Sequence, residues 1–146
     1  MTVSSLSSAT INLPSKQTVA RRIWPLGLLA AALTMFANAV IFFIVVDGFG
    51  VSDAALDTVM PTLVLSALGA LGATVVFAVI ARSARQPIHT FRLVAFAVLV
   101  VSFVPDFLMT GATTPWGVPT LLMMHIVAAL IIVGVLTRGH PDGAHG

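Results

Sequence analysis

The chain has 146 residues, of which 58% are hydrophobic and only 8% are charged, and its formal net charge at pH 7 is +2. So few charged residues cannot cover a water-soluble domain, and no basic stripe interleaved with aromatic residues is present to bind nucleic acid. The absence of cysteine excludes disulfides, thiolate metal sites and thiol redox chemistry. We therefore expect an integral membrane protein.

Residues 1–20 are rich in serine and threonine and contain too little continuous apolar surface to fold alone. We predict that they form a flexible cytoplasmic tail. Arg21 and Arg22 open an apolar run that resembles the start of a secretion signal, with small residues at 37–39 as a cleavage site. The run continues to Val46, so cleavage would leave a new N-terminus inside hydrocarbon, and we interpret the segment as a retained anchor.

Four apolar segments follow one another along the chain, at residues 23–46, 59–81, 91–109 and 118–137. Each is long enough to cross a hydrocarbon core of roughly 30 Å, at about 1.5 Å rise per helical residue. We predict an all-α polytopic membrane protein, in which residues 21–138 form an antiparallel bundle of four transmembrane helices.

The positively charged residues lie on one side of these segments and predict the orientation of the bundle. They precede the first segment, surround the second connection and follow the last segment: Lys16, Arg21, Arg22, Arg82, Arg85, Arg92 and Arg138. The positive-inside rule then places both termini in the cytoplasm. Residues 139–146 form a second flexible cytoplasmic tail, whose two histidines we do not interpret as a metal site.

Small residues recur at helical spacing in the first two segments. Lipid is as apolar as leucine, so close packing through small side chains must help to hold membrane helices together. We predict that helix-packing faces are formed by Ala30, Thr34 and Asn38 in the first segment and by Ser66, Ala70 and Thr74 in the second.

Three polar side chains lie in the predicted outer half of the bundle, at depths of about 12 Å for Asn38, about 10 Å for His125 and about 5 Å for Asp106 at 1.5 Å per residue. Polar and ionisable residues at such depths are costly unless they face partners or water. The short connection at residues 110–117 makes the last two segments neighbours, so Asp106 and His125 are expected to pair. We take Asn38, Asp106 and His125 as the candidate ligand or proton site.

Each ionisable member of this candidate site has alternative interpretations. For His125 we favour a neutral imidazole bonded to Asn38 or to a backbone carbonyl, while a proton-linked ligand site and an axial ligand of a haem or magnesium tetrapyrrole stay open. Asp106 either ends the third segment in headgroup water or binds a proton or cation beside backbone opened by Pro105.

The order of Asn38, then Val104-Pro105-Asp106, then Met124-His125 followed by residues 126–129 resembles an uncharacterised family of small bacterial four-helix membrane proteins, chiefly actinobacterial, known only as a domain of unknown function. The resemblance covers residues 23–136 and implies no activity.

The function we favour is that of a non-enzymatic membrane protein, either a homo-oligomer or an accessory subunit of a larger complex, in the bacterial cytoplasmic membrane. The alternative is a transporter or channel-like module for protons or a small solute that uses Asp106 and His125.

We expect no enzyme, because no nucleophile, base and orienting group are visible together. The cofactor is unknown: we favour none, and a tetrapyrrole through His125 stays an alternative. The expected partners are the lipid bilayer and other membrane subunits, not nucleic acid.

Overall fold

A computed structural model describes residues 16–50, 59–108 and 115–138 of the chain, with side chains from residue 23 onward. It contains α1 (Lys16–Phe43), the π-helix η1 (Ile44–Gly48), α2 (Val59–Ser83), α3 (Pro87–Leu108) and α4 (Gly117–Arg138). Four helices are long and apolar enough to cross a membrane. The prediction of an all-α chain with four transmembrane helices is confirmed.

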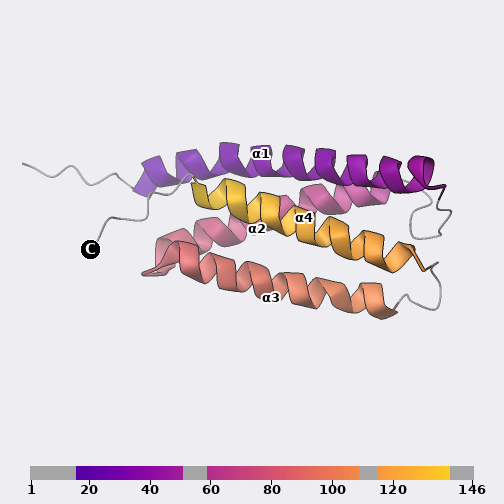
Figure 1. The fold of residues 1–146 in the computed structure, drawn as a ribbon. Coiled ribbons are helices and arrows are strands. Elements are labelled where there is room, and N and C mark those ends of the chain that lie inside the picture. The colour runs from indigo at the N-terminus through magenta and orange to yellow at the C-terminus, as the bar shows by residue number, and fades with distance from the viewer. Residues whose placement is uncertain (1–15, 51–58, 109–114, 139–146) are drawn as a thin grey trace, which may run out of the picture.

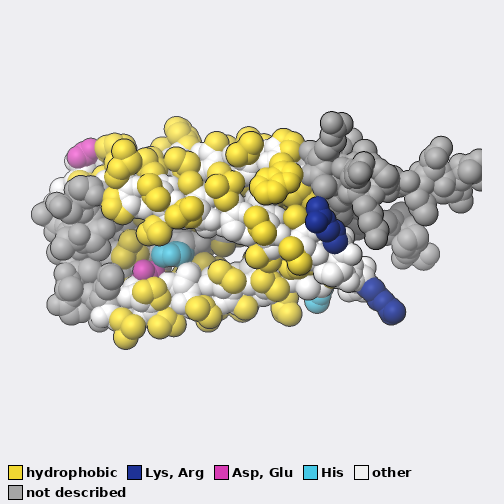
Figure 2. All heavy atoms as spheres, turned by 180° about the vertical axis from the view of Figure 1, so that it is seen from behind, with side chains coloured by type: hydrophobic (Ala, Val, Ile, Leu, Met, Phe, Trp, Pro, Cys, Tyr) yellow, Lys and Arg dark blue, Asp and Glu magenta, His cyan; other side chains and the backbone are white. Residues whose placement is uncertain are grey.

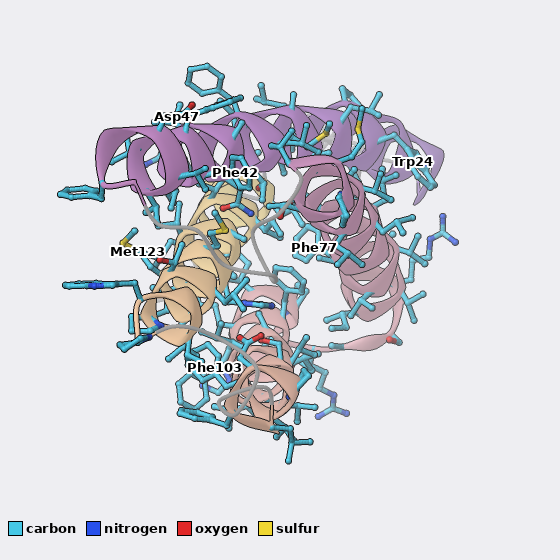
Figure 3. The ribbon with its side chains drawn as sticks, turned by 90° about the vertical axis from the view of Figure 1, so that its right-hand side faces the viewer. Trp24, Phe42, Asp47, Phe77, Phe103 and Met123 are labelled. Carbon is cyan, nitrogen blue, oxygen red and sulfur yellow. The ribbon has the colours of Figure 1, made fainter. Side chains whose placement is uncertain are left out.

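The helices run antiparallel in chain order, as Figure 1 shows. Each packs on its neighbours in the chain, and α4 returns to pack on α1, so the four helices close a ring that is seen from its end in Figure 3. The most extensive contact joins α1 and α2, and α1 also packs closely on α4. Helix α3 lies across the bundle from α1 and is held by α2 and α4.

Two of the helix boundaries differ from those expected from the apolar segments. Helix α1 begins at Lys16, so Pro25 lies inside it and residues 16–20 are helical rather than part of a tail. Helix α3 begins at Pro87, where the missing N–H removes a donor that would have no partner within the helix. Pro105 also lies inside α3, which continues to Leu108.

The last turn of the first span widens into η1. The Phe49 N–H donates to the Ile44 carbonyl, five residues back, at 3.2 Å. Gly50 follows with φ of 62°, a left-handed conformation that glycine adopts without steric cost. The π-helix therefore extends the first span to Gly48 before the chain turns.

The interior contains two apolar clusters separated along the bundle. The first joins all four helices at the end that carries the arginines, through Ile23, Phe77, Phe91 and Leu136. The Phe77 and Phe91 rings meet at 4.8 Å between centroids with an interplanar angle of 62°. The second cluster, Phe42, Val45 and Met124, lies at the opposite end of the bundle.

The outer surface of the bundle is apolar, which Figure 2 shows for one face. The described arginines gather at one end of the molecule, as Figure 2 shows. Asp47 belongs to η1, at the opposite end of the first span. Trp24 and Trp116 are exposed near opposite ends, where an indole can place its ring in the acyl boundary and its N–H among headgroups. Such a surface suits lipid, so the fold is that of a multi-pass membrane protein.

Candidate functional site

Asp106 and His125 meet where the end of α3 lies beside the beginning of α4. Nδ1 of His125 is 3.3 Å from Oδ2 of Asp106. The Asp106 side chain is only 9% exposed, whereas the His125 side chain is 39% exposed. The pair therefore has a buried carboxylate on the inside and an imidazole that reaches the surface of the bundle. Asp106 lies within α3, two residues before its end at Leu108, and its buried side chain meets His125 of α4.

The Nδ1 atom of His125 has a second, closer neighbour on its own helix. It lies 2.9 Å from the Leu121 carbonyl, four residues back. A carbonyl only accepts, so this hydrogen bond requires the proton to be on Nδ1. The 3.3 Å contact with Asp106 does not have hydrogen-bond geometry, and Oδ2 is left without a partner. We therefore treat the carboxylate contact as electrostatic, and in the neutral ring Nε2 carries the free lone pair.

A third contact fixes the plane of the imidazole. The Phe103 ring, labelled in Figure 3, meets the His125 ring edge to face, with centroids 6.3 Å apart and planes at 89°. Phe103 precedes Asp106 by three residues, so both project from the same side of α3. The imidazole is thus held by a carbonyl, a carboxylate and an aromatic ring.

The other ring nitrogen of His125 is open. Within the described ranges, Nε2 has no hydrogen-bond partner, and it is not among the buried unpaired atoms. Figure 2, which views the bundle from the side opposite to α4 in Figure 1, shows a histidine and an acidic side chain side by side in a hollow. The part-exposed imidazole therefore lies in this hollow, within the length of a membrane span.

Asn38, the third predicted member of the site, lies on α1 and has other partners. Its Nδ2 donates to the Ser66 hydroxyl of α2 at 2.7 Å, and that hydroxyl donates to the Thr62 carbonyl at 2.7 Å. The structure thus joins Asp106 with His125, and Asn38 with Ser66. The sequence allows Asn38 or a carbonyl as the partner of His125, and the structure has the carbonyl of Leu121.

The small residues expected in helix packing lie between α1 and α2. Ala30, Thr34, Ala70 and Thr74 are all 0% exposed, and Asn38 is buried beside them. Ser66 is half-buried. Thr74 donates its hydroxyl to the Ala70 carbonyl at 2.7 Å, so its polar group is satisfied inside its own helix.

Sequence reasoning missed three members of these contacts. A β-carbon on Gly27 would collide with the Thr74 side chain, so α1 and α2 approach closely there. Gly27 precedes Ala30 by three residues, and this helical spacing was a usable signal. Phe103 and the Leu121 carbonyl gave no such signal, because apolar residues occur throughout both helices.

Three buried oxygen atoms lack a hydrogen-bond partner within the part of the chain that the structure describes: Thr34 Oγ1, Asn38 Oδ1 and Asp106 Oδ2. Each lies in a predicted transmembrane helix, where an unsatisfied polar group costs more than it does near water. Thr34 differs from Thr74, Thr120 and Thr137, whose hydroxyls bond to carbonyls four residues back.

A comparison with known families identifies the chain at the level of family. A family model described as "Family of unknown function (DUF6069)" matches residues 18–142. The chain belongs to the DUF6069 family. The resemblance to an uncharacterised family is thereby confirmed. No curated protein and no solved structure matches the chain.

The DUF6069 bundle thus contains a paired acid and histidine, but few further groups for chemistry. Among its described residues no cluster of three or more His, Cys, Asp or Glu side chains could hold a metal ion. The arrangement can hold or pass a proton between Asp106 and His125, and it can present Nε2 of His125 to a molecule beside the bundle.

Proposed function

We propose that this DUF6069 protein is a non-enzymatic membrane protein that assembles laterally in the bilayer, either as a homo-oligomer or as an accessory subunit of a larger membrane complex. The observation that carries the proposal is the broad apolar outer surface of α3, which has the smallest buried share of the four spans, beside the part-exposed His125.

Lipid tails offer no hydrogen-bond donor, so a polar group that faces them is unfavourable by an amount that grows with depth. Membrane proteins therefore direct such groups toward protein or toward a wet cavity. The His125 ring is held in place by its contacts with Leu121 and Phe103, and its side chain is 39% exposed. A neighbouring subunit that covers the hollow in which His125 lies is the simplest source of a partner.

The extent of packing favours α3 as part of the surface that assembles. Helix α3 has the smallest buried share of the four spans, because it contacts only α2 and α4 extensively. A helix held on two sides has a broad surface left for another helix. Packing of a second subunit there would add the dispersion contacts that stabilise helices in lipid.

A non-enzymatic role is supported by what surrounds the acid and the histidine. A hydrolytic triad needs a hydroxyl or thiol nucleophile in reach of the imidazole. The described contacts of His125 are with Leu121, Asp106 and Phe103, none of which supplies one.

The test is the native mass of the full chain in lipid nanodiscs or mild detergent. We expect a mass above that of the monomer, and we expect His125→Leu to reduce it. Met123→Leu is the matched control, because Met123 is an exposed apolar residue on the same helix. A wild-type monomer at every protein-to-lipid ratio would contradict the proposal, as would a His125→Leu mass equal to that of the wild type.

Proton- or small-solute-linked transport is the second candidate, favoured by the buried, unpaired Oδ2 of Asp106 beside a titratable histidine. Proteoliposomes that contain a pH-sensitive dye would test it under an imposed membrane potential. Proton flux that depends on protein and is lost in Asp106→Asn would favour transport over assembly.

We further propose that the protein resides in a bacterial cytoplasmic membrane with both termini inside. The described arginines lie at one end of the bundle, which is where α1 begins and α4 ends. This arrangement supports the orientation that the positive-inside rule predicts.

A further inference from the structure

Helices α2 and α3 are neighbours in the ring, but they are joined most closely at the end of the bundle that carries the arginines. There the Phe77 and Phe91 rings are in contact within the first apolar cluster. The second cluster takes its described members from the first span, α2 and α4, and none from α3. Of the four contacts around the ring, the one between α2 and α3 is the least extensive. The second half of α3 is therefore held mainly by α4.

The hollow that contains His125 opens on this side of the bundle. Figure 2 views the molecule from the side of α2, opposite to α4, and shows the Asp106–His125 pair within the hollow. The imidazole is part-exposed there, and the carboxylate lies deeper. Both residues lie within the length of a membrane span, so the hollow opens toward lipid.

We propose that this hollow binds the ammonium group of a small lipophilic amine, with the Asp106 carboxylate and Nε2 of His125 as the groups that accept its hydrogen bonds. The apolar part of the amine then lies between α2 and α3 or in the surrounding lipid. This site goes beyond the proposed assembly, because its occupant is a small molecule and not a subunit. It also names the class of solute that the second candidate function requires, and its test does not depend on transport.

The first support is that the pair offers hydrogen-bond acceptors. Nδ1 of His125 carries the proton that is bonded to the Leu121 carbonyl, so Nε2 of the neutral ring has a free lone pair. An ionised Asp106 carboxylate only accepts, and its Oδ2 has no hydrogen-bond partner among the described residues. An ammonium group has donors and no acceptor, so it complements both side chains.

The second support is the charge of the pair. A neutral imidazole and an ionised carboxylate together carry one negative charge, which is costly inside a membrane unless a cation lies beside it. The arginines of the described ranges lie at the opposite end of the bundle and cannot supply that cation. A bare metal ion needs about three or four protein ligands. No group of three or more candidate side chains exists within the described ranges, so an organic cation fits better than a metal ion.

The third support is the apolar environment of the pair. Leu99 and Phe103 precede Asp106 by seven and three residues, so they lie on the same side of α3, and both are half-buried. Small-molecule sites are mostly apolar, with a few polar groups that fix the orientation of the ligand. A lipophilic amine can enter such a site sideways from the bilayer, whereas a hydrated inorganic ion cannot.

The test is a calorimetric titration of the full chain in phosphatidylcholine nanodiscs with n-octylammonium chloride. Empty nanodiscs give the partition of the amine into lipid, which is subtracted. The matched ligand is n-octanol, which has the same alkyl chain and no charge. We expect saturable binding of n-octylammonium, and we expect n-octanol to bind more weakly by about 10-fold or more, because a hydrogen bond to a charged group is stronger than one between neutral groups. Equal affinities of the wild-type chain for the two ligands would overturn the inference without the use of any variant.

Two variants locate the site. Asp106→Asn keeps the shape of the side chain and removes its charge, so it should abolish the preference for n-octylammonium over n-octanol. Asp47→Asn is the matched control, because it removes an exposed carboxylate of η1 and should leave the preference unchanged. A preference that persists in Asp106→Asn, or one that is lost in Asp47→Asn, would contradict binding at the Asp106–His125 pair.

Nitrogen-15 resonances of the histidine rings give a readout that a merely structural role of Asp106 does not move. The Nε2 resonance of His125, assigned by its absence in His125→Gln, should shift when n-octylammonium is added to the wild-type chain. The ring resonances of His89, an exposed histidine near the other end of α3, should not shift. An unchanged His125 resonance at saturation would exclude Nε2 as an acceptor and overturn the site as proposed.

The outcome also separates this inference from the proposed assembly. A native mass that depends on His125, without a preference for n-octylammonium, overturns the amine site and leaves the assembly standing. A preference for n-octylammonium that depends on Asp106, in a protein that stays monomeric, supports the amine site and overturns the assembly.

Discussion

Gly27 of α1 lies so close to Thr74 of α2 that a β-carbon at position 27 would collide with the threonine side chain. Thr74 is fully buried and its hydroxyl is bonded to the Ala70 carbonyl, so the side chain has no space into which to move. The two helices can approach to this distance only because position 27 has no side chain. This contact lies in the most extensive helix pair of the bundle.

Gly27→Ala should therefore destabilise the bundle, by about 1–3 kcal/mol in the free energy of unfolding, because α1 and α2 must separate. Unfolding in mixed micelles by a denaturing detergent gives the measurement. Gly69→Ala is the matched control, since a β-carbon there meets nothing within 4 Å.

The same collision predicts a specific rescue. Thr74→Ala removes the two side-chain atoms nearest to position 27, so the penalty of Gly27→Ala should shrink in that background. An equal penalty in both backgrounds would show that Gly27 acts elsewhere than at Thr74.

Ala70→Leu should disrupt packing at the centre of α2, because Ala70 is fully buried against its neighbours. We expect a loss of about 1–3 kcal/mol in the free energy of unfolding, or a shift in native mass. Ala97→Leu makes the same change at an exposed position of α3 and should have little effect. Native mass and stability that survive Ala70→Leu would mean that this face meets lipid.

Asp106 and His125 should be energetically coupled. Their contact of 3.3 Å predicts an interaction energy of roughly 0.5 kcal/mol or more between Asp106→Asn and His125→Gln in a double-mutant cycle. The cycle can be measured on stability or on ligand binding. Strict additivity would reduce the two residues to independent structural roles.

The topology prediction concerns the whole chain. A reporter fused after Asp53 should lie outside the cell, while reporters at Met1 and at Gly146 should remain inside, because all seven lysines and arginines lie on one side of the spans. An external signal from Gly146 would contradict an even number of spans.

The sequence alone predicted the helices well, since apolar length is a local property. A segment of about 20 apolar residues satisfies its backbone hydrogen bonds internally and forms a helix in lipid whatever its neighbours are. The small residues of α1 and α2 were also visible, because a stripe with helical spacing can be read from one segment. The exact ends of the helices were harder to predict: α1 begins at Lys16, before the apolar segment starts, and continues through Pro25.

Tertiary structure decided which polar groups meet. Asn38, Asp106 and His125 all lie in the predicted outer half of the bundle. The depth of a residue along its helix does not specify which neighbouring helix its side chain faces. Because α1 packs on α2, Asn38 bonds to Ser66. Because α3 packs on α4, Asp106 contacts His125. The orientation of the imidazole likewise depends on the Leu121 carbonyl and the Phe103 ring. The sequence by itself therefore determined a four-span membrane protein with polar groups within the spans, and the rotation of the helices about their axes decided which of those groups pair.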